Sequence, residues 1–458
     1  MGRDLWKRKR ASGASSHRGR RRGHAALACA CACDAAAEHG RRVVVTGTGV
    51  ASPLGWSASE AHARLMGAES AVQLLQLDSS EQLPVRIAAP VDGELFPSRW
   101  LPPKLAKRAD RYITLMAASA KSALADAHLV PDPERCSHPD VADRSRAGIV
   151  AGSAMGGMSA LCGGVNALFQ SSYRRMSPFC IPFAISNTGA ALNAIDVGFE
   201  GPNYSANTAC ATGNHCISLA ASHIFRGEAD VMLAGASDAA LLPAGLAGFA
   251  ESRSLSTRND SPKEASRPFD RHRDGFVMGE GSSMLTLESL SHARARGAKP
   301  LVEVAGFASN SDAFHMMEPD PSGRSVSRCM VEALHAASES ACNVDLVNAH
   351  ATSTQAGDAA ELKAIEDAVG TGRALVNATK SMVGHMLGAS SAFEAVACIK
   401  AIERGEVHPT RNFEKADDGV DAGAVVGKEA LHRKVRLALS NSFGFGGHNA
   451  VLVLRKVE

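Results

Sequence analysis

The chain has 458 residues, of which 45% are hydrophobic and 21% charged, a composition typical of a soluble globular protein with a large core. No uninterrupted apolar run reaches the roughly 18 residues that a membrane-spanning helix needs, so no span is predicted. Residues 1–40 hold nine basic and three acidic residues, and the remainder holds 40 basic and 44 acidic ones, so the body is not basic and nucleic acid is a poor partner.

The first 40 residues differ in composition from the rest of the chain. They are rich in Arg, Ala, Ser and His, and no acid occurs between Asp4 and Asp34. This composition is typical of a cleavable organelle transit peptide, and the alternatives are a disordered extension or upstream sequence mistranslated from a gene model. The 11 cysteines show no paired spacing, so we expect reduced thiols in a cytosolic or organellar-matrix setting.

From residue 41 onward, short apolar strands alternate with alanine-rich helices, which predicts a layered α/β architecture. The first strand begins at Arg41 and runs into Gly47-Thr48-Gly49. These glycines suggest a dinucleotide-binding loop, but Ser52 and the lack of a suitably placed acid argue against it. Further strands are predicted at Ala147–Ala151, Val231–Ala234, Ser283–Leu287, Val302–Val304, Leu346–Asn348, Ala374–Asn377, Leu437–Leu439 and Ala450–Leu454, and helices at Arg111–Ala127, Gly213–Arg226, Ser325–Ala337, Asp358–Val369 and Ser390–Arg404.

Cys210 lies just ahead of the helix predicted at Gly213–Arg226, within the run Asn-Thr-Ala-Cys-Ala-Thr-Gly. A helix N-terminus presents unpaired N–H groups and positive potential, which we expect to stabilise a thiolate. Since the thiolate is the nucleophilic form of cysteine, Cys210 is a candidate for covalent catalysis. The alternative is a buried small hydrophobic residue, which is the usual role of a cysteine.

Two histidines in glycine-, serine- and threonine-rich segments accompany this cysteine. His350 lies in Asn-Ala-His-Ala-Thr-Ser-Thr at 348–354, and His385 lies in Lys-Ser-Met-Val-Gly-His at 380–385. Each is expected to follow a short strand and to sit among small residues. Neutral imidazoles in such a setting can donate hydrogen bonds to a developing oxyanion or transfer a proton.

These three segments, in this order and spacing, resemble those of the β-ketoacyl-acyl-carrier-protein synthases, and most closely the plant and algal plastid type I enzymes. The likeness covers roughly residues 41–458. Further segments that carry it are Ser-Arg-Pro-Phe-Asp at 266–270, Arg-Asp-Gly-Phe-Val-Met-Gly-Glu-Gly at 273–281 and Asn-Ser-Phe-Gly-Phe-Gly-Gly-His-Asn at 441–449. One departure is visible, because Ser390 and Ser391 stand where the family usually has Ala-Gly.

The resemblance implies a thiolase-like fold, in which two pseudo-duplicated α/β halves form a five-layer α-β-α-β-α arrangement, usually in a homodimer. By analogy, the halves are expected at 41–297 and 298–458, with a boundary near Arg296–Pro300 that Gly297 and Pro300 also indicate. The family docks acidic carrier protein on a basic stretch that matches Lys104, Lys107 and Arg108, although an ordinary solvated surface is the more usual reason for such a stretch. The apolar segment Phe179–Ile185 matches a region near the acyl tunnel and the dimer interface.

The resemblance also assigns a role to each matching residue. Cys210 would hold the acyl chain, and His350 and His385 would act on the malonyl thioester. Lys380 would pair with Glu361 in support of catalysis, although a purely structural ion pair is an equal alternative. The remaining roles are an oxyanion hole formed by the backbone N–H groups of Cys210 and Phe445, with Phe445 also gating the acyl pocket, and a phosphopantetheine site at Thr352 and Thr354.

The function implied is decarboxylative Claisen condensation of malonyl-acyl carrier protein (ACP) with an acyl-enzyme thioester during fatty acid elongation. The chemistry needs no metal and no bound cofactor, since 4′-phosphopantetheine arrives on the carrier protein. A stand-alone polyketide ketosynthase and a non-catalytic chain-length partner subunit are the alternatives, and the retained Cys210, His350 and His385 argue against the second. The plastid stroma is the expected location, with the mitochondrial matrix as the alternative.

Overall fold

The computed structural model describes residues 40–75, 83–92, 100–130, 139–418 and 420–458. The predicted transit peptide at 1–40 therefore lies, apart from Gly40, outside the described residues. Residues Arg41–Glu458 form one unit. Within the described ranges, no helix has both the length and the apolar character needed to cross a membrane.

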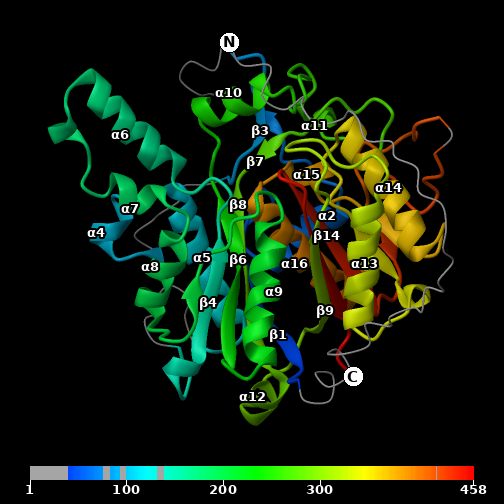
Figure 1. Ribbon diagram of the computed structural model, residues 1–458, viewed down its shortest axis with the longest axis horizontal. Helices are drawn as coiled ribbons and strands as arrows, with labels where there is room; N and C mark the ends of the chain where they lie inside the picture. Colours follow the sequence, from blue (N-terminus) through cyan, green and yellow to red (C-terminus); the bar gives the residue numbers. More distant parts are fainter. Residues whose placement is uncertain (1–39, 76–82, 93–99, 131–138, 419) are drawn as a thin grey trace, which may run out of the picture. The chain divides into compact units, whose positions relative to one another are not determined.

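Among the described residues, ten strands form the main sheet, and five of them come from each half of the chain (Figure 1). The first half contributes β1 (Val43–Ala51), β4 (Ala147–Gly152), β5 (Asn203–Tyr204), β6 (Val231–Asp238) and β8 (Gly281–Ser289). The second half contributes β9 (Val302–Ser311), β10 (Leu346–Asn348), β11 (Leu375–Asn377), β14 (Leu437–Gly444) and β15 (His448–Arg455). Their order across the sheet is β11-β10-β14-β15-β9-β1-β8-β6-β4-β5.

The two sets of five strands have the same topology. In the first set, β8 is antiparallel to both β1 and β6, and β4 is parallel to both β6 and β5. In the second set, β15 is antiparallel to both β9 and β14, and β10 is parallel to both β14 and β11. The sets meet where β1 pairs with β9, with Val44 opposite Glu303. This repetition confirms the expected duplication, while the boundary at 297/298 stays a prediction.

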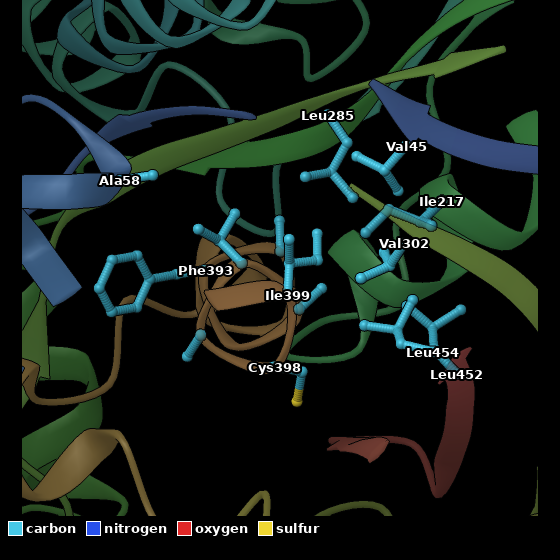
Figure 2. Close-up of a cluster of buried hydrophobic side chains, with 14 of the residues drawn as sticks. Val45, Ala58, Ile217, Leu285, Val302, Phe393, Cys398, Ile399, Leu452 and Leu454 are labelled. Atoms are coloured by element: carbon cyan, nitrogen blue, oxygen red, sulfur yellow. The ribbon is translucent and has the colours of Figure 1, made fainter. Parts of the chain in front are cut away.

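Two helices from opposite halves pack against each other between the two sets of strands. They are α9 (Thr212–Phe225) and α16 (Gly388–Arg404). Every residue of α16 from Gly388 to Ile402 is buried, as expected for a helix covered on all sides. Figure 2 shows Phe393 and Ile399 of this helix within the apolar cluster that both halves share. α9 and α16 thus form the middle layer of the predicted five.

The outer layers are also formed by equivalent helices. α5 (Arg111–Asp126) packs on β1 and β8, and α8 (Thr188–Val197) packs on β4. On the other side, α13 (Arg324–Ala336) packs on β9 and β15, and α14 (Gln355–Val369) packs on α13. The strands and helices named in the sequence analysis are all present in the structure. The strands predicted at Val302–Val304 and Leu437–Leu439 were much too short, because β9 continues to Ser311 and β14 to Gly444.

Glycines in β1 and β9 allow the outer helices to approach closely. A Cβ at Gly47 would lie 2.2 Å from the carbonyl oxygen of Ala123 in α5, and a Cβ at Gly306 would lie 2.6 Å from that of Ala333 in α13. The first glycine of Gly47-Thr48-Gly49 therefore serves helix packing.

Shorter elements make up the rest of the described secondary structure. A small sheet joins β2 (Gln73–Leu74), β3 (Ile87–Ala89) and β7 (Met278–Gly279), and β12 (Glu406–Val407) pairs with β13 (Leu431–His432). The remaining α-helices are α2 (Ala58–Met66), α4 (Pro103–Ala106), α6 (Met158–Gln170), α7 (Cys180–Ala184), α10 (Pro243–Glu251), α11 (Pro262–Ala265), α12 (Leu290–Ala295) and α15 (Lys380–Val383), and single 3-10 turns lie at Arg144–Arg146, Tyr173–Arg175 and Ala341–Asn343.

Candidate active site

The structure brings Cys210, His350 and His385 together, so that one ligand atom from each lies within 4.8 Å of the others. Nε2 of His385 is 3.0 Å from Sγ of Cys210, and the rings of the two histidines are 5.5 Å apart, edge to face. Cys210 precedes α9, and His350 follows β10 as expected. The prediction that His385 follows a strand is wrong, because the short helix α15 lies between β11 and this histidine.

These three side chains line a pocket of about 470 Å³. Four aromatic rings, those of Phe249, Phe276, Phe443 and Phe445, line the same space. A mostly apolar pocket with a few convergent polar groups is the usual form of a small-molecule binding site.

A tight turn fixes Cys210 at the start of α9. Ala209 is left-handed, with φ of 50°, and Thr212 Oγ1 accepts the N–H of Thr208 and donates to the carbonyl oxygen of Ala209. Burial raises the pKa of the Cys210 thiol to about 12, although the charge of Lys380 acts to lower it. The expected stabilisation of a thiolate is therefore wrong in its net direction, because burial raises the pKa of the thiol more than the neighbouring backbone N–H groups lower it.

The end of β14 lies close to the nucleophile turn. A Cβ at Gly444 would lie 2.4 Å from the carbonyl oxygen of Thr208 and 3.3 Å from the nitrogen of Cys210, so only glycine permits this approach. The approach brings the backbone N–H of Phe445 beside that of Cys210, and both act on the sulfur to lower its pKa. Two N–H groups converging on one point are the arrangement of an oxyanion hole, although that role stays a prediction.

A buried lysine supports His350. Nζ of Lys380 donates to the carbonyl oxygen of His350 at 2.6 Å, contacts its Nδ1 at 3.3 Å and forms an ion pair with Glu394. The predicted pairing of Lys380 with Glu361 is wrong. Both Glu361 oxygens accept backbone N–H groups instead, those of His350 at 2.8 Å and Ala351 at 2.7 Å.

Glu394 was missed by the sequence analysis, although the sequence carries a signal for it. It is the one acid between Ala389 and Ile402, a stretch that is otherwise apolar apart from two serines and one lysine. A single carboxylate on a helix buried on all sides must have a partner. The partner of Glu394 could not be identified from the sequence, because apolar periodicity does not show that Lys380 of α15 lies beside α16.

The surroundings of both histidines favour their neutral form. Burial, followed by the charge of Lys380, lowers the pKa of His385 well below its ordinary value, and the same two causes act on His350 in the same order. On His385, the nitrogen that faces away from Cys210 is Nδ1, which lies 3.1 Å from Oγ of Ser390. Ser390 is the first of the two serines that depart from the family pattern.

Some of the other predicted site residues line this pocket and others do not. Thr352 and Thr354 line the same pocket, and their hydroxyl oxygens are 3.1 Å apart. Arg108 lies over the ring of Phe179, 5.3 Å from its centroid. Neither that arginine nor the rest of the basic stretch at 104–108 belongs to the pocket lining, so its proposed carrier-protein contact stays a prediction.

One group of described side chains could hold a metal ion. Cys210, His350 and His385 offer a thiol and two imidazoles, the ligand set of soft divalent cations. The expectation that no metal takes part in the chemistry stays a prediction.

Two protein-family models match the chain, namely Beta-ketoacyl synthase, N-terminal domain, over residues 40–293 and Beta-ketoacyl synthase, C-terminal domain, over residues 301–414. Among curated proteins, the chain is 46% identical over 414 residues to 3-oxoacyl-[acyl-carrier-protein] synthase II, chloroplastic, of Arabidopsis thaliana, covering 90% of this chain and 75% of that protein. It is also 46% identical over 415 residues to 3-oxoacyl-[acyl-carrier-protein] synthase I, chloroplastic, of Hordeum vulgare, covering 90% and 88%.

A solved structure shares the fold. This structure is of a type II PKS acyl-carrier protein in complex with its ketosynthase bound to the hexaketide. The matching chain is 30% identical with a TM-score of 0.82, and the alignment covers 92% of this chain and all of that one.

Proposed function

Because this chain belongs to the β-ketoacyl synthase family, we propose that it condenses malonyl-ACP with an acyl group held on Cys210 during fatty acid elongation. The products are 3-oxoacyl-ACP, CO₂ and free ACP. The observation that carries this proposal is the 3.0 Å contact between Cys210 and the neutral imidazole of His385, with His350 beside them in an apolar pocket. A thiol and two imidazoles suit acyl transfer followed by carbon–carbon bond formation.

The first half-reaction loads the enzyme. The Cys210 sulfur attacks the carbonyl carbon of an acyl-ACP thioester, and the N–H groups of Cys210 and Phe445 stabilise the oxyanion that forms. The bond to the pantetheine sulfur then breaks, and that sulfur leaves with the proton that the Cys210 thiol loses. Because burial disfavours a free thiolate here, proton loss and carbon–sulfur bond formation are expected to be closely coupled.

The second half-reaction forms the new carbon–carbon bond. Malonyl-ACP loses CO₂, and the electron pair of the broken bond becomes an enolate whose oxygen accepts hydrogen bonds from His350 and His385. The enolate carbon attacks the acyl carbonyl, the bond to the Cys210 sulfur breaks, and the sulfur regains a proton from solvent. Thr352 and Thr354 line the pocket, where they can hydrogen-bond the pantetheine arm.

A second copy of the chain is the proposed partner for an exposed apolar surface. Phe169 of α6 is 82% exposed and Ile195 of α8 is 77% exposed, and Tyr173 and Ile181 lie between them in sequence and are also exposed. An apolar surface of this extent is typical of an interface, so we propose a homodimer through the surface of α6, α7 and α8. The chloroplastic relatives and the composition of residues 1–40 support import into the plastid stroma, with the mitochondrial matrix as the alternative.

Intact-protein mass spectrometry tests the function. The full chain is mixed with acyl-ACPs of graded length, and malonyl-ACP is added in a second step. We expect an acyl adduct that is absent in Cys210→Ala and that discharges when malonyl-ACP is added. If the folded protein forms no adduct at any length, the elongation function is excluded. The polyketide and partner-subunit alternatives would then be favoured.

A further inference from the structure

The hydroxyl of Ser390 connects the backbone of the His385 segment to the imidazole of His385. Ser390 is only 1% exposed, near the start of α16. Its Oγ accepts the backbone N–H of Met386 at 2.8 Å and lies 3.1 Å from Nδ1 of His385. The N–H group can only donate, so it uses a lone pair of Oγ and leaves the hydroxyl proton for another acceptor. Within the described part of the chain, Nδ1 of His385 is the other hydrogen-bonding atom that contacts this oxygen.

We propose that Ser390 is a positioning residue that holds His385 with its proton on Nε2, the nitrogen that faces Cys210 and the reacting atoms. A hydroxyl that donates to Nδ1 requires a lone pair there, and a neutral imidazole with a lone pair on Nδ1 carries its proton on Nε2. His385 then acts as a hydrogen-bond donor to the enolate. This inference rests on the proposed function, and it adds a residue that the reaction depends on through His385.

The same relation holds for the other histidine, with a different donor. Nζ of Lys380 also can only donate, so its 3.3 Å contact makes Nδ1 of His350 the acceptor. Lys380 therefore sets the tautomer of His350, as Ser390 sets that of His385. Both imidazoles consequently present an Nε2–H group, and two such groups can bind one enolate oxygen.

The neighbouring serine has a separate task. Oγ of Ser391 accepts the backbone N–H of Asn214 at 3.2 Å and donates to the carbonyl oxygen of Gly388 at 3.1 Å. Asn214 lies in the first turn of α9, whose N–H groups have no partner within the helix. Ser391 thus supports the helix that follows Cys210, while Ser390 supports His385, so a substitution at Ser391 is not a neutral control.

Measuring the two half-reactions separately distinguishes a positioning role of Ser390 from a purely structural role. In Ser390→Ala, His385 can also adopt the tautomer with the proton on Nδ1, which cannot donate to the enolate. We expect malonyl-ACP decarboxylation to slow about two- to tenfold, the equivalent of one neutral hydrogen bond. Acyl transfer to Cys210 should change less. In the tautomer with the proton on Nδ1, the lone pair on Nε2 of His385 can accept the thiol proton. Ser119→Ala removes a buried helical hydroxyl that bonds Ser282, and it serves as the folding control.

Two measurements decide whether Ser390 acts through His385. On a His385→Gln background, Ser390→Ala should have no further effect on decarboxylation. In ¹⁵N-histidine-labelled protein, the His385 signal, assigned by its loss in His385→Gln, should show the proton on Nε2 and a mixture of tautomers in Ser390→Ala.

A proton on Nδ1 in the wild type would overturn the inference, and so would unchanged decarboxylation in Ser390→Ala. If the wild type itself neither accepts an acyl group nor decarboxylates malonyl-ACP, the proposed function fails. The tautomer measurement still tests the role of Ser390 in that case.

Discussion

Replacing Gly444 by alanine tests the oxyanion hole without removing a functional side chain. A Cβ at this position would lie 2.4 Å from the carbonyl oxygen of Thr208, well inside van der Waals contact, and 3.3 Å from the nitrogen of Cys210. Both of these contacting atoms belong to the backbone. Since neither can rotate away, the end of β14 must shift and carry the Phe445 N–H with it. Loss of one oxyanion donor costs about 10²- to 10³-fold in rate, so acyl transfer to Cys210 should fall by that factor.

The assay is the rate of adduct formation on Cys210, followed by intact-protein mass spectrometry from a saturating acyl-ACP. Overpacking also destabilises the protein by about 1–3 kcal/mol, so thermal unfolding is measured in parallel. Gly427→Ala is the matched control, because its added Cβ meets no atom within 4 Å. An acyl-transfer rate in Gly444→Ala within about twofold of the wild type would refute the assignment of the Phe445 N–H, given the much larger loss expected for an oxyanion donor.

Three further perturbations follow from the structure. Lys380→Ala leaves Glu394 buried without its ion-pair partner, so urea unfolding should show a loss of about 3–5 kcal/mol, and a loss below about 1 kcal/mol would contradict the pair. Burial lowers the pKa of His408 from 6.5 to about 4. Between these pH values, His408 binds a proton in the unfolded chain but not in the native state. The free energy of unfolding should therefore fall by up to about 3 kcal/mol through His408 between pH 6.5 and 4, and urea titrations of His408→Asn should lack that part of the slope. Glu substitutions at Phe169 and Ile195 should convert a dimer to a monomer in light scattering, and an unchanged mass would exclude this surface as the interface.

Local sequence patterns predicted the elements of the fold well, because apolar periodicity and length decide whether a buried segment is a strand or a helix. The strand predicted at Leu346–Asn348 matches β10 at both ends. The order of strands across the sheet was not available from these patterns. Pairing of β1 with β9 joins residues about 260 positions apart, and only the family resemblance implied the duplicated halves.

The candidate site was predictable to the extent that its residues lie in distinctive segments. Cys210, His350 and His385 were found in this way, and the structure brings them together. The predicted ion-pair partner of Lys380 was wrong, because Glu361 and Glu394 are both buried acids on helices and only packing distinguishes them. The predicted direction of the pKa shift of the Cys210 thiol was also wrong. The sequence indicates the helix that follows Cys210 but not how deeply the sulfur is buried.

The duplication explains why the reaction needs both halves of the chain. α9 and α16 occupy equivalent places in the two repeats. Cys210 lies two residues before the first residue of α9, and His385 lies three residues before the first residue of α16. Each repeat alone therefore carries only one member of the 3.0 Å contact between thiol and imidazole. The two helices bury their surfaces against each other, so separating the halves would expose the apolar cluster they share. The packing that stabilises the middle layer is thus the same packing that aligns nucleophile and imidazole, and a substitution that loosens α16 against α9 should reduce condensation before the outer layers unfold.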